Sequence, residues 1–282
     1  MINFIKYRLW FLAFSLSVIV LGLYFILAHG FVYSIDFIGG GLIEFDASAD
    51  KSAKAERLME KDYPGLDFQK TSTGFIIKST SLDKQRADKV AKNLSQELKI
   101  KKTRFELVGA SVSSTNVYKI VVAVLLAILG ILGYVAFQFK EWRFGVAAIS
   151  ALIHDSLVLV GLWAILGYYW AVELDVLFVT ALLTTMSFSV HDTIVIFDKI
   201  QEEEQQGSFG RLSERINWAL NLTMMRSLNN SLTVVIMLSS LIILGGESTR
   251  AFAVSLMIGT ITGTYSSPFV ATPIYYLLAK KE

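Results

Sequence analysis

The chain has 282 residues, of which 54% are hydrophobic and 18% charged, and its mean hydropathy is +0.53. This balance excludes an ordinary soluble domain and is typical of a membrane protein. The net charge of +2 gives no indication of a nucleic-acid partner. Cysteine is absent, which excludes disulfides, thiolate metal sites and cofactor chemistry through sulfur. We expect no cofactor.

The first apolar stretch follows Lys6 and Arg8 and runs from Leu9 to Ala28. It is longer than the apolar part of a secretory signal, and it has no small-x-small cleavage site. We therefore predict a retained transmembrane helix within residues 1–30.

A polar segment, residues 31–115, carries interleaved charges of both signs. Its patterns predict strands at 41–46, 67–71, 74–79 and 103–108, and helices at 49–61 and 82–99, with Pro64-Gly65 in a turn. The order β-α-β-β-α-β is that of a ferredoxin-like plait. The mixed charge indicates the solvated surface of a small α+β domain, with a specific charged binding patch as the alternative.

Residues 116–282 are nearly all apolar and predict a five-helix transmembrane bundle. The expected spans are 117–139, 144–168, 172–197, 227–244 and 252–278. Together with the first helix, they make an α-helical polytopic membrane protein with six transmembrane helices. Pro268 and Pro273 should kink the last span.

Basic residues in the short loops predict the orientation of the chain. One side carries Lys6, Arg8, Lys140, Arg143, Lys199, Arg211, Arg215, Lys280 and Lys281, and the other only Arg250. Both termini are therefore expected in the cytoplasm, and the α+β domain between helices 1 and 2 in the periplasm or outside the cell. An amphipathic segment at about 199–226 should lie along the cytoplasmic face.

The first candidate for chemistry is Asp192, near the end of the apolar run 172–198. An ionised carboxylate at this depth costs about 2.5 to 3.5 kcal/mol on insertion scales. The side chain should therefore face protein or water, find a cation, or carry a proton. Thr185 and Ser189 fall on the same helical face and form a polar stripe that could hold water.

Arg226, at the start of the fifth span, shares a helical face with Asn229, Asn230 and Thr233. We expect this face to point to the same interior as Asp192, where a bidentate arginine-carboxylate pair could form. One alternative is a static ion pair that fixes helix register. Another is that Arg226 extends to the headgroups as an anchor.

Two His-Asp dipeptides, His154-Asp155 and His191-Asp192, raise the possibility of a metal site. Neighbouring side chains on a helix diverge by about 100°, so we expect neither dipeptide to converge on one ion. No His-Glu-x-x-His spacing is present. We predict no metal site, a neutral His154 bonded to a neighbouring helix, and for Asp155 either a packing role or a polar role supporting the site.

Two further patterns are structural. Small residues recur in the last span at helical spacing and allow close helix approach; they are Ser255, Gly259, Thr262 and Ser266. Gly39 to Gly41 has neither a phosphate-binding nor a dinucleotide-binding spacing and indicates a bend after the first helix.

Several stretches together resemble the SecD/SecF family of protein-export membrane proteins, within the resistance-nodulation-division superfamily. They are Ile35-Asp36-Phe37-Ile38-Gly39-Gly40, Ala151-Leu152-Ile153-His154-Asp155, Val190-His191-Asp192-Thr193-Ile194-Val195, Met225-Arg226-Ser227, and Gly245-Gly246 followed by Gly263-Thr264-Tyr265-Ser266-Ser267. Each motif is weak alone, but together and in order they are specific, and they cover essentially the whole chain.

The resemblance implies that Asp192 and Arg226 are the proton-relay carboxylate and arginine. It leaves supporting polar roles for His191, His154, Asp155, Ser189, Thr185, Asn229 and Asn230. Two departures stand out: His191 replaces the usual Asn before the aspartate, and Ile38 replaces the usual Thr or Ser before the glycine pair.

The resemblance also implies a function that is not enzymatic. A SecF-like subunit in the bacterial cytoplasmic membrane would couple proton flow to late-stage translocation and release of polypeptides. Its partners would be a SecD-like complementary half, the SecYEG channel, a translocating unfolded polypeptide and protons. The alternative is half of a proton-driven transporter for a small molecule or lipid. A membrane scaffold without energy coupling would leave Asp192 without a role.

Overall fold

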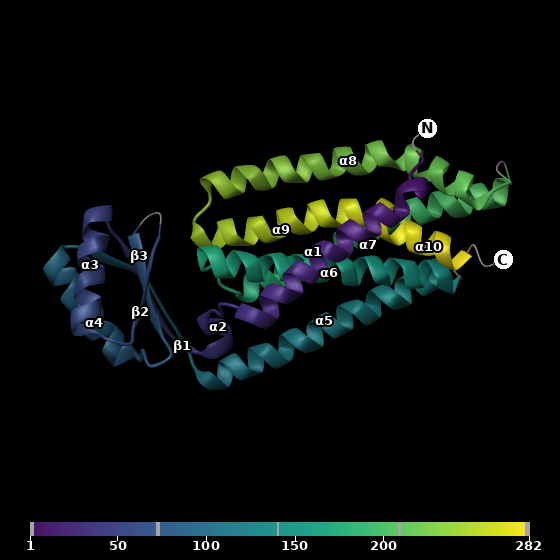
Figure 1. Cartoon of the computed structure of the whole chain (residues 1–282). Helices are drawn as coiled ribbons and strands as arrows, with labels where there is room; N and C mark the ends of the chain where they lie inside the picture. The colour runs from purple at the N-terminus through teal and green to yellow at the C-terminus, as the bar shows by residue number, and fades with distance from the viewer. Residues whose placement is uncertain (1–2, 72–73, 140, 208–209, 280–282) are drawn as a thin grey trace. The chain divides into compact units, whose positions relative to one another are not determined.

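The computed structural model describes residues 3–71, 74–139, 141–207 and 210–279. It divides into two compact units, one made of Met1–Val32 with Ala123–Glu282 and the other of Tyr33–Val122. Figure 1 shows the elements of both units. Lys140, Lys280 and Lys281, used above to predict orientation, lie outside the described residues.

The second unit is a small α+β domain. Its elements are α2 (Ile35–Ile38), β1 (Gly40–Asp46), α3 (Ala49–Asp62), β2 (Asp67–Lys70), β3 (Gly74–Ser79), α4 (Lys84–Leu98) and β4 (Lys101–Val108), and the start of α5 (Ala110–Phe139) follows. The predicted order of strands and helices from β1 to β4 is confirmed. The four strands form an antiparallel sheet in the order β2-β3-β1-β4 (Figure 1).

The apolar residues that alternate along β1 and β3 form the core of this domain. Ile43, Phe45, Phe75 and Ile77 are fully buried on one face of the sheet, where they pack with the apolar sides of α3 and α4. The Phe45 and Phe75 rings stack with centroids 5.0 Å apart. Burying each such side chain stabilises the fold by about 1.5–3 kcal/mol.

The first unit is a helical bundle. It contains η1 (Ile5–Tyr7), α1 (Arg8–His29), the rest of α5, α6 (Trp142–Trp170), α7 (Val176–Gln206), α8 (Leu212–Leu244), α9 (Glu247–Ser266), η2 (Ser267–Ala271) and α10 (Thr272–Ala279). Among the described residues, five helices are long and apolar enough to cross a membrane: Ile5–His29, Ser113–Phe139, Trp142–Trp170, Val176–Gln206 and Leu212–Leu244. The chain is therefore a polytopic membrane protein. The count of six spans stays a prediction.

The sixth expected span, 252–278, falls on α9, η2 and α10, which follow one another without a break. The disturbance predicted at Pro268 takes the form of a π-helical stretch, Ser267–Ala271. Proline lacks a backbone N–H and crowds the preceding turn, and a wider turn accommodates both effects.

The ends of α7 show how its sequence sets its length. Asp175 caps the start, where its carboxylate accepts a hydrogen bond from the Phe178 N–H at 2.7 Å. Gly207, with φ of 67°, ends the helix in the left-handed region. The expected amphipathic segment 199–226 is not a separate helix, because its residues complete α7 and begin α8.

Small residues bring the helices close together. A Cβ added to Gly22 of α1 would lie 2.7 Å from the Gly161 Cα of α6, and one added to Gly259 of α9 would lie 1.9 Å from Thr185 Cγ2 of α7. Gly259 belongs to the predicted small-residue stripe, so its close packing is confirmed. These contacts fix the spacing of the helices around the buried polar groups described next.

Candidate functional site

Asp192 lies in α7 with only 8% of its surface exposed. Its Oδ1 accepts a hydrogen bond from Ser227 Oγ of α8 at 2.5 Å. Its Oδ2 is buried and makes no hydrogen bond of good geometry among the described residues, although the Ser267 hydroxyl lies near enough to stabilise the carboxylate. The predicted acidic position is thus enclosed by protein, with one oxygen satisfied and the other unpaired.

Arg226 does not form the expected pair with this carboxylate. No hydrogen bond or ion pair joins Arg226 to Asp192 in the part of the chain that the structure describes, although the two side chains are close enough to interact electrostatically. Arg226 is exposed. The reason is geometric: Ser227 faces Asp192, and the preceding residue is turned about 100° away around α8.

The residues that share the arginine face are also exposed: Asn229, Asn230 and Thr233. The expectation that this face points to the same interior as Asp192 was wrong for the chain by itself. The face lies on the outside of the bundle. The relay role assigned to Arg226 stays a prediction.

A second carboxylate, Asp155 of α6, lies deeper, with 3% of its surface exposed. Its Oδ2 accepts hydrogen bonds from Ser189 Oγ of α7 and, at 2.6 Å, from Ser266 Oγ of α9. Its Oδ1 lies 2.8 Å from His154 Nδ1. Asp155 therefore joins three helices through hydrogen bonds, so of the two predicted roles its contacts fit the supporting polar one.

The contact between His154 and Asp155 corrects the expectation that neighbouring side chains diverge. Their Cβ atoms do point about 100° apart, but both side chains are long enough to turn toward each other along the helix surface. The expected hydrogen bond from His154 to a neighbouring helix is absent among the described residues, because His154 Nδ1 contacts Asp155 of the same helix. Its Nε2 is buried and unpaired among the described residues.

Hydroxyl groups connect the surroundings of the two carboxylates. Ser267 Oγ of η2 lies 2.9 Å from Thr193 Oγ1, next to Asp192 in α7. The same hydroxyl donates to the Ser189 carbonyl at 3.5 Å. Both acidic groups therefore border one buried polar region between α6, α7, α8 and α9.

The polar stripe predicted on α7 is buried as expected at Thr185, Ser189 and Asp192. Glycines of α9 pack against it: a Cβ on Gly263 would lie 3.2 Å from the Ser189 Cα and Cβ. Thr185 donates its hydroxyl to the Leu182 carbonyl of its own helix. Its role is thus packing beside the site, whereas Ser189 reaches Asp155.

A second polar stripe on α7 faces outward and was not predicted. Its members recur at helical spacing and are all exposed: Thr180, Thr184, Ser187 and His191. His191, the departure from the usual Asn, therefore lies on the outer surface beside Asp192. This surface and the arginine face of α8 are two outward polar faces of the bundle.

Three contributors to the site were missed from the sequence: Ser227, Thr193 and Ser267. Ser227 was read only as the first residue of a span. The available signal was its spacing, because Ser227 and Ser231 are one turn apart on α8 and both are buried.

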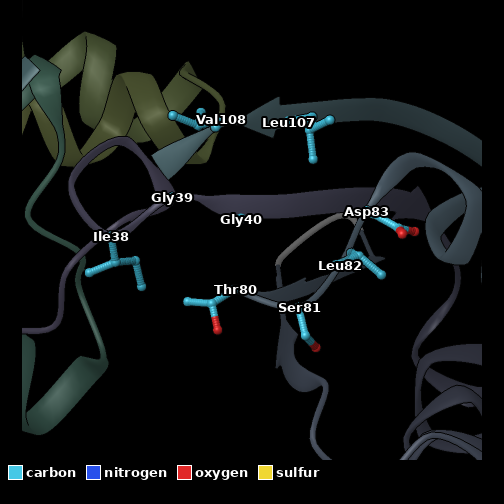
Figure 2. A pocket seen from close by; sticks show the side chains of 10 residues that line it. Ile38, Gly39, Gly40, Thr80, Ser81, Leu82, Asp83, Leu107 and Val108 are labelled. Atoms are coloured by element: carbon cyan, nitrogen blue, oxygen red, sulfur yellow. The ribbon is translucent and has the colours of Figure 1, made fainter. Parts of the chain in front are cut away.

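Within the described ranges, no group of three or more His, Asp or Glu side chains could hold a metal ion. The α+β domain has an open hollow of about 280 Å³ (Figure 2). Small and apolar residues line most of it: Ile38, Gly39, Gly40, Thr80, Ser81, Leu82, Asp83, Leu107, Val108 and Gly109. Its carboxylate, Asp83, caps α4 by accepting from the Arg86 N–H at 2.7 Å. The hollow offers no cluster for catalysis.

The bundle, its buried Asp155 and Asp192 and its α+β domain define a polytopic membrane protein with an acidic site between its helices. Residues 87–281 match the family model described as protein export membrane protein SecD/SecF, C-terminal. The chain therefore belongs to this family. Its relatives include SecF protein translocase subunits.

Two such relatives match over nearly their whole length. The SecF subunit of Thermobaculum terrenum is 37% identical over 96% of this chain and 92% of its own, and that of Anaerolinea thermophila is 35% identical over 97% and 92%. The crystal structure of SecDF from Thermus thermophilus, a translocon-associated membrane protein, is similar with a TM-score of 0.89 and 32% identity. The match covers 99% of this chain but 38% of that one.

Proposed function

We propose that this chain is a SecF-like subunit of the Sec protein-export machinery and couples proton flow to late-stage translocation and release of polypeptides on the outer side of the membrane. Its activity is transport rather than catalysis. The proposal includes six spans in the bacterial cytoplasmic membrane, both termini in the cytoplasm, and a ferredoxin-like domain outside. The observation that carries it is the buried carboxylate of Asp192 with one unpaired oxygen.

This arrangement suits a proton carrier. A buried carboxylate with no cation bound to it avoids the cost of an isolated charge by holding a proton. When the proton leaves, Asp192 needs a positive partner, and Arg226 is one residue from the serine that already touches it. We propose that Arg226 turns to Asp192 in the deprotonated state and turns away when the proton returns.

The energy available is sufficient for such a cycle. One charge crossing 100 mV yields about 2.3 kcal/mol, and each pH unit of gradient adds about 1.4 kcal/mol. A two-state equilibrium shifts from 1:99 to 99:1 for about 5.5 kcal/mol. At 100 mV and one pH unit, one proton supplies about 3.7 kcal/mol, so two protons cover such a change in population.

The two outward polar faces support a complementary half as partner. Polar side chains facing hydrocarbon are costly and normally meet protein or water. SecDF of Thermus thermophilus contains more than this chain, which spans 38% of it. We propose that a SecD-like half covers these faces, with the SecYEG channel beyond it.

In this proposal the ferredoxin-like domain acts in binding or in mechanical coupling. No group of three or more His, Asp or Glu side chains that could hold a metal ion occurs in its described residues. In the same unit, Ser113 in the first turn of α5 donates a hydrogen bond to the Phe37 carbonyl of α2. This bond joins the start of a spanning helix to the entry of the sheet, so movement of α5 would reach the domain that engages the translocating polypeptide.

The test is Asp192→Asn, assayed with the SecD-like half and the SecYEG channel in vesicles that carry a proton gradient. We expect normal insertion and assembly but no stimulation of polypeptide release by the gradient. Ser150→Ala is the control, since Ser150 is partly exposed and, among the described residues, its hydroxyl donates to the Val146 carbonyl of its own helix. Wild-type stimulation in Asp192→Asn would refute the assignment. Proton flow that does not depend on the presence of a translocating polypeptide would favour the alternative, a transporter for a small molecule or lipid.

A further inference from the structure

The proposed proton cycle at Asp192 leaves the buried Asp155 of α6 unused. Asp155 is completely surrounded: Ser189 and Ser266 donate to Oδ2, and His154 Nδ1 meets Oδ1. Both members of the His-Asp pair are more than nine-tenths buried. A pair enclosed in this way at membrane depth calls for a role beyond helix packing.

The hydrogen bonds indicate which protons the pair already holds. Three donors satisfy an ionised Asp155, provided that the Nδ1 of His154 carries a hydrogen. In that tautomer, Nε2 bears a free lone pair, and this atom is buried without a partner among the described residues. The ring therefore presents one vacant proton position. Filling it turns a buried negative charge into a neutral imidazolium-carboxylate pair, which a low-dielectric site tolerates better.

We propose that His154 and Asp155 form a second proton-binding site, with His154 Nε2 as the atom that takes the proton, and that this site and Asp192 load in a coupled order. The inference rests on the proposed proton cycle at Asp192. In the loading step, an N–H bond forms at Nε2 with a proton from water. In the release step, that bond breaks and the proton returns to water.

The coupling follows from the shared helix. Ser189, which donates to Asp155, lies three residues before Asp192, so the two polar contacts are neighbours along one face of α7. Ser267 contacts both sections of this face, through the Ser189 carbonyl and through Thr193. A proton on one site removes negative charge near the other and lowers its affinity for a proton.

The groups around the pair are few. On α7 they are Asp192 and, on the outer surface, His191. On α9 the Tyr265 ring lies 6.3 Å from the His154 ring, and Ser15 of α1 donates to the Tyr265 hydroxyl at 3.2 Å.

The remaining neighbours of α6 add no charge to this set. η2 presents the Ser267 hydroxyl, and α10 presents Tyr275, which stacks on Phe144 about three helical turns from the pair. Asp192 is therefore the group whose charge should control proton binding at His154.

The experiment uses the three histidines of the chain. The full chain, with ¹⁵N-labelled imidazoles, is titrated in lipid bilayers by solid-state nuclear magnetic resonance, and His29→Gln and His191→Asn assign the signals. We expect His154 Nε2 to gain a proton as the pH is lowered through the titration. At pH values where Asp192 has released its proton, Asp192→Asn removes that negative charge and should lower the proton affinity of this nitrogen by about tenfold, and Ser150→Ala should leave it unchanged.

Two results would overturn the inference. One is a His154 ring that stays neutral over the whole range. The other is a titration that Asp192→Asn does not move, since the two sites would then be independent. Ser266→Ala, which removes one donor from Asp155 and keeps the pair, should raise the proton affinity of the ring, and an unchanged value would count against the pair as one site. A failure of Asp192→Asn to stop gradient-driven export would refute the proposed function and leave the ring titration as a separate result.

Discussion

The closest helix contact in the bundle gives the sharpest structural prediction. Gly259→Ala adds one methyl group, whose carbon would lie 1.9 Å from Thr185 Cγ2, 2.4 Å from its Cβ and 3.0 Å from its Oγ1. Ordinary carbon contacts begin near 3.5 Å. To accept the methyl group, α9 must therefore move away from α7 by roughly 1.5 Å.

Such overpacking costs about 1–3 kcal/mol. For a domain of this size class, each kcal/mol lowers the thermal midpoint by about 2–4 °C. The movement should also reach the site, because Gly263 and Ser266 lie one and two turns further along the same helix. We thus expect a lower midpoint together with a weakened bond from Ser266 to Asp155.

Scanning calorimetry of the purified chain in detergent measures the midpoint. Gly133→Ala is the matched control, because no atom of the described chain lies within 4 Å of a Cβ at Gly133 of α5. Combining Gly259→Ala with Thr185→Ala should recover part of the loss, since this change removes Cγ2 and Oγ1 and sacrifices no bond between helices. A Gly259→Ala protein as stable as the Gly133→Ala control would refute the reasoning.

Three further predictions concern other parts of the molecule. Arg226→Lys should retain part of the gradient-stimulated export and Arg226→Met none, because lysine keeps the charge but loses the planar fork; full activity of the Met variant would reduce the arginine to an anchor. Gly161→Leu should separate α1 from α6 at Gly22 and lower the thermal midpoint more than Gly145→Leu, whose Cβ meets no atom within 4 Å; equal midpoints would contradict the close contact. Deleting Asp46–Val108 should preserve co-purification with a SecD-like half but stop release of exported protein; continued release would exclude the domain from that step.

The sequence predicted what depends on local pattern. Alternation of apolar residues placed β1 and β3, and the length of the apolar runs placed the spanning helices. The buried face of α7 followed from helical spacing, since Thr185, Ser189 and Asp192 recur every three or four residues. These features require only the periods of strand and helix.

The contacts across helices could not be predicted in the same way. Whether Arg226 or Ser227 meets Asp192 depends on the rotation of α8 about its axis, and that rotation is set by packing along the whole helix. The His154-Asp155 contact depends on side-chain rotamers rather than on Cβ directions. Helical spacing shows which residues share a face but not which partner the face will meet.

The rotation of α8 also bears on whether this chain alone contains the whole of the proposed relay. Asp192 lies inside the bundle, but His191 and Arg226, on either side of it, lie on the outward polar faces. A carboxylate that reaches inward to Ser227 and interacts electrostatically with two outward cationic or titratable groups sits at a boundary, not at the centre of a closed site. If a complementary half covers those faces, it also removes His191 and Arg226 from lipid, strengthens their interaction with Asp192, and makes proton binding depend on how the two halves meet. The same contact that satisfies the polar faces would then allow a proton at Asp192 to change the arrangement of the halves, which is the coupling that the export cycle requires.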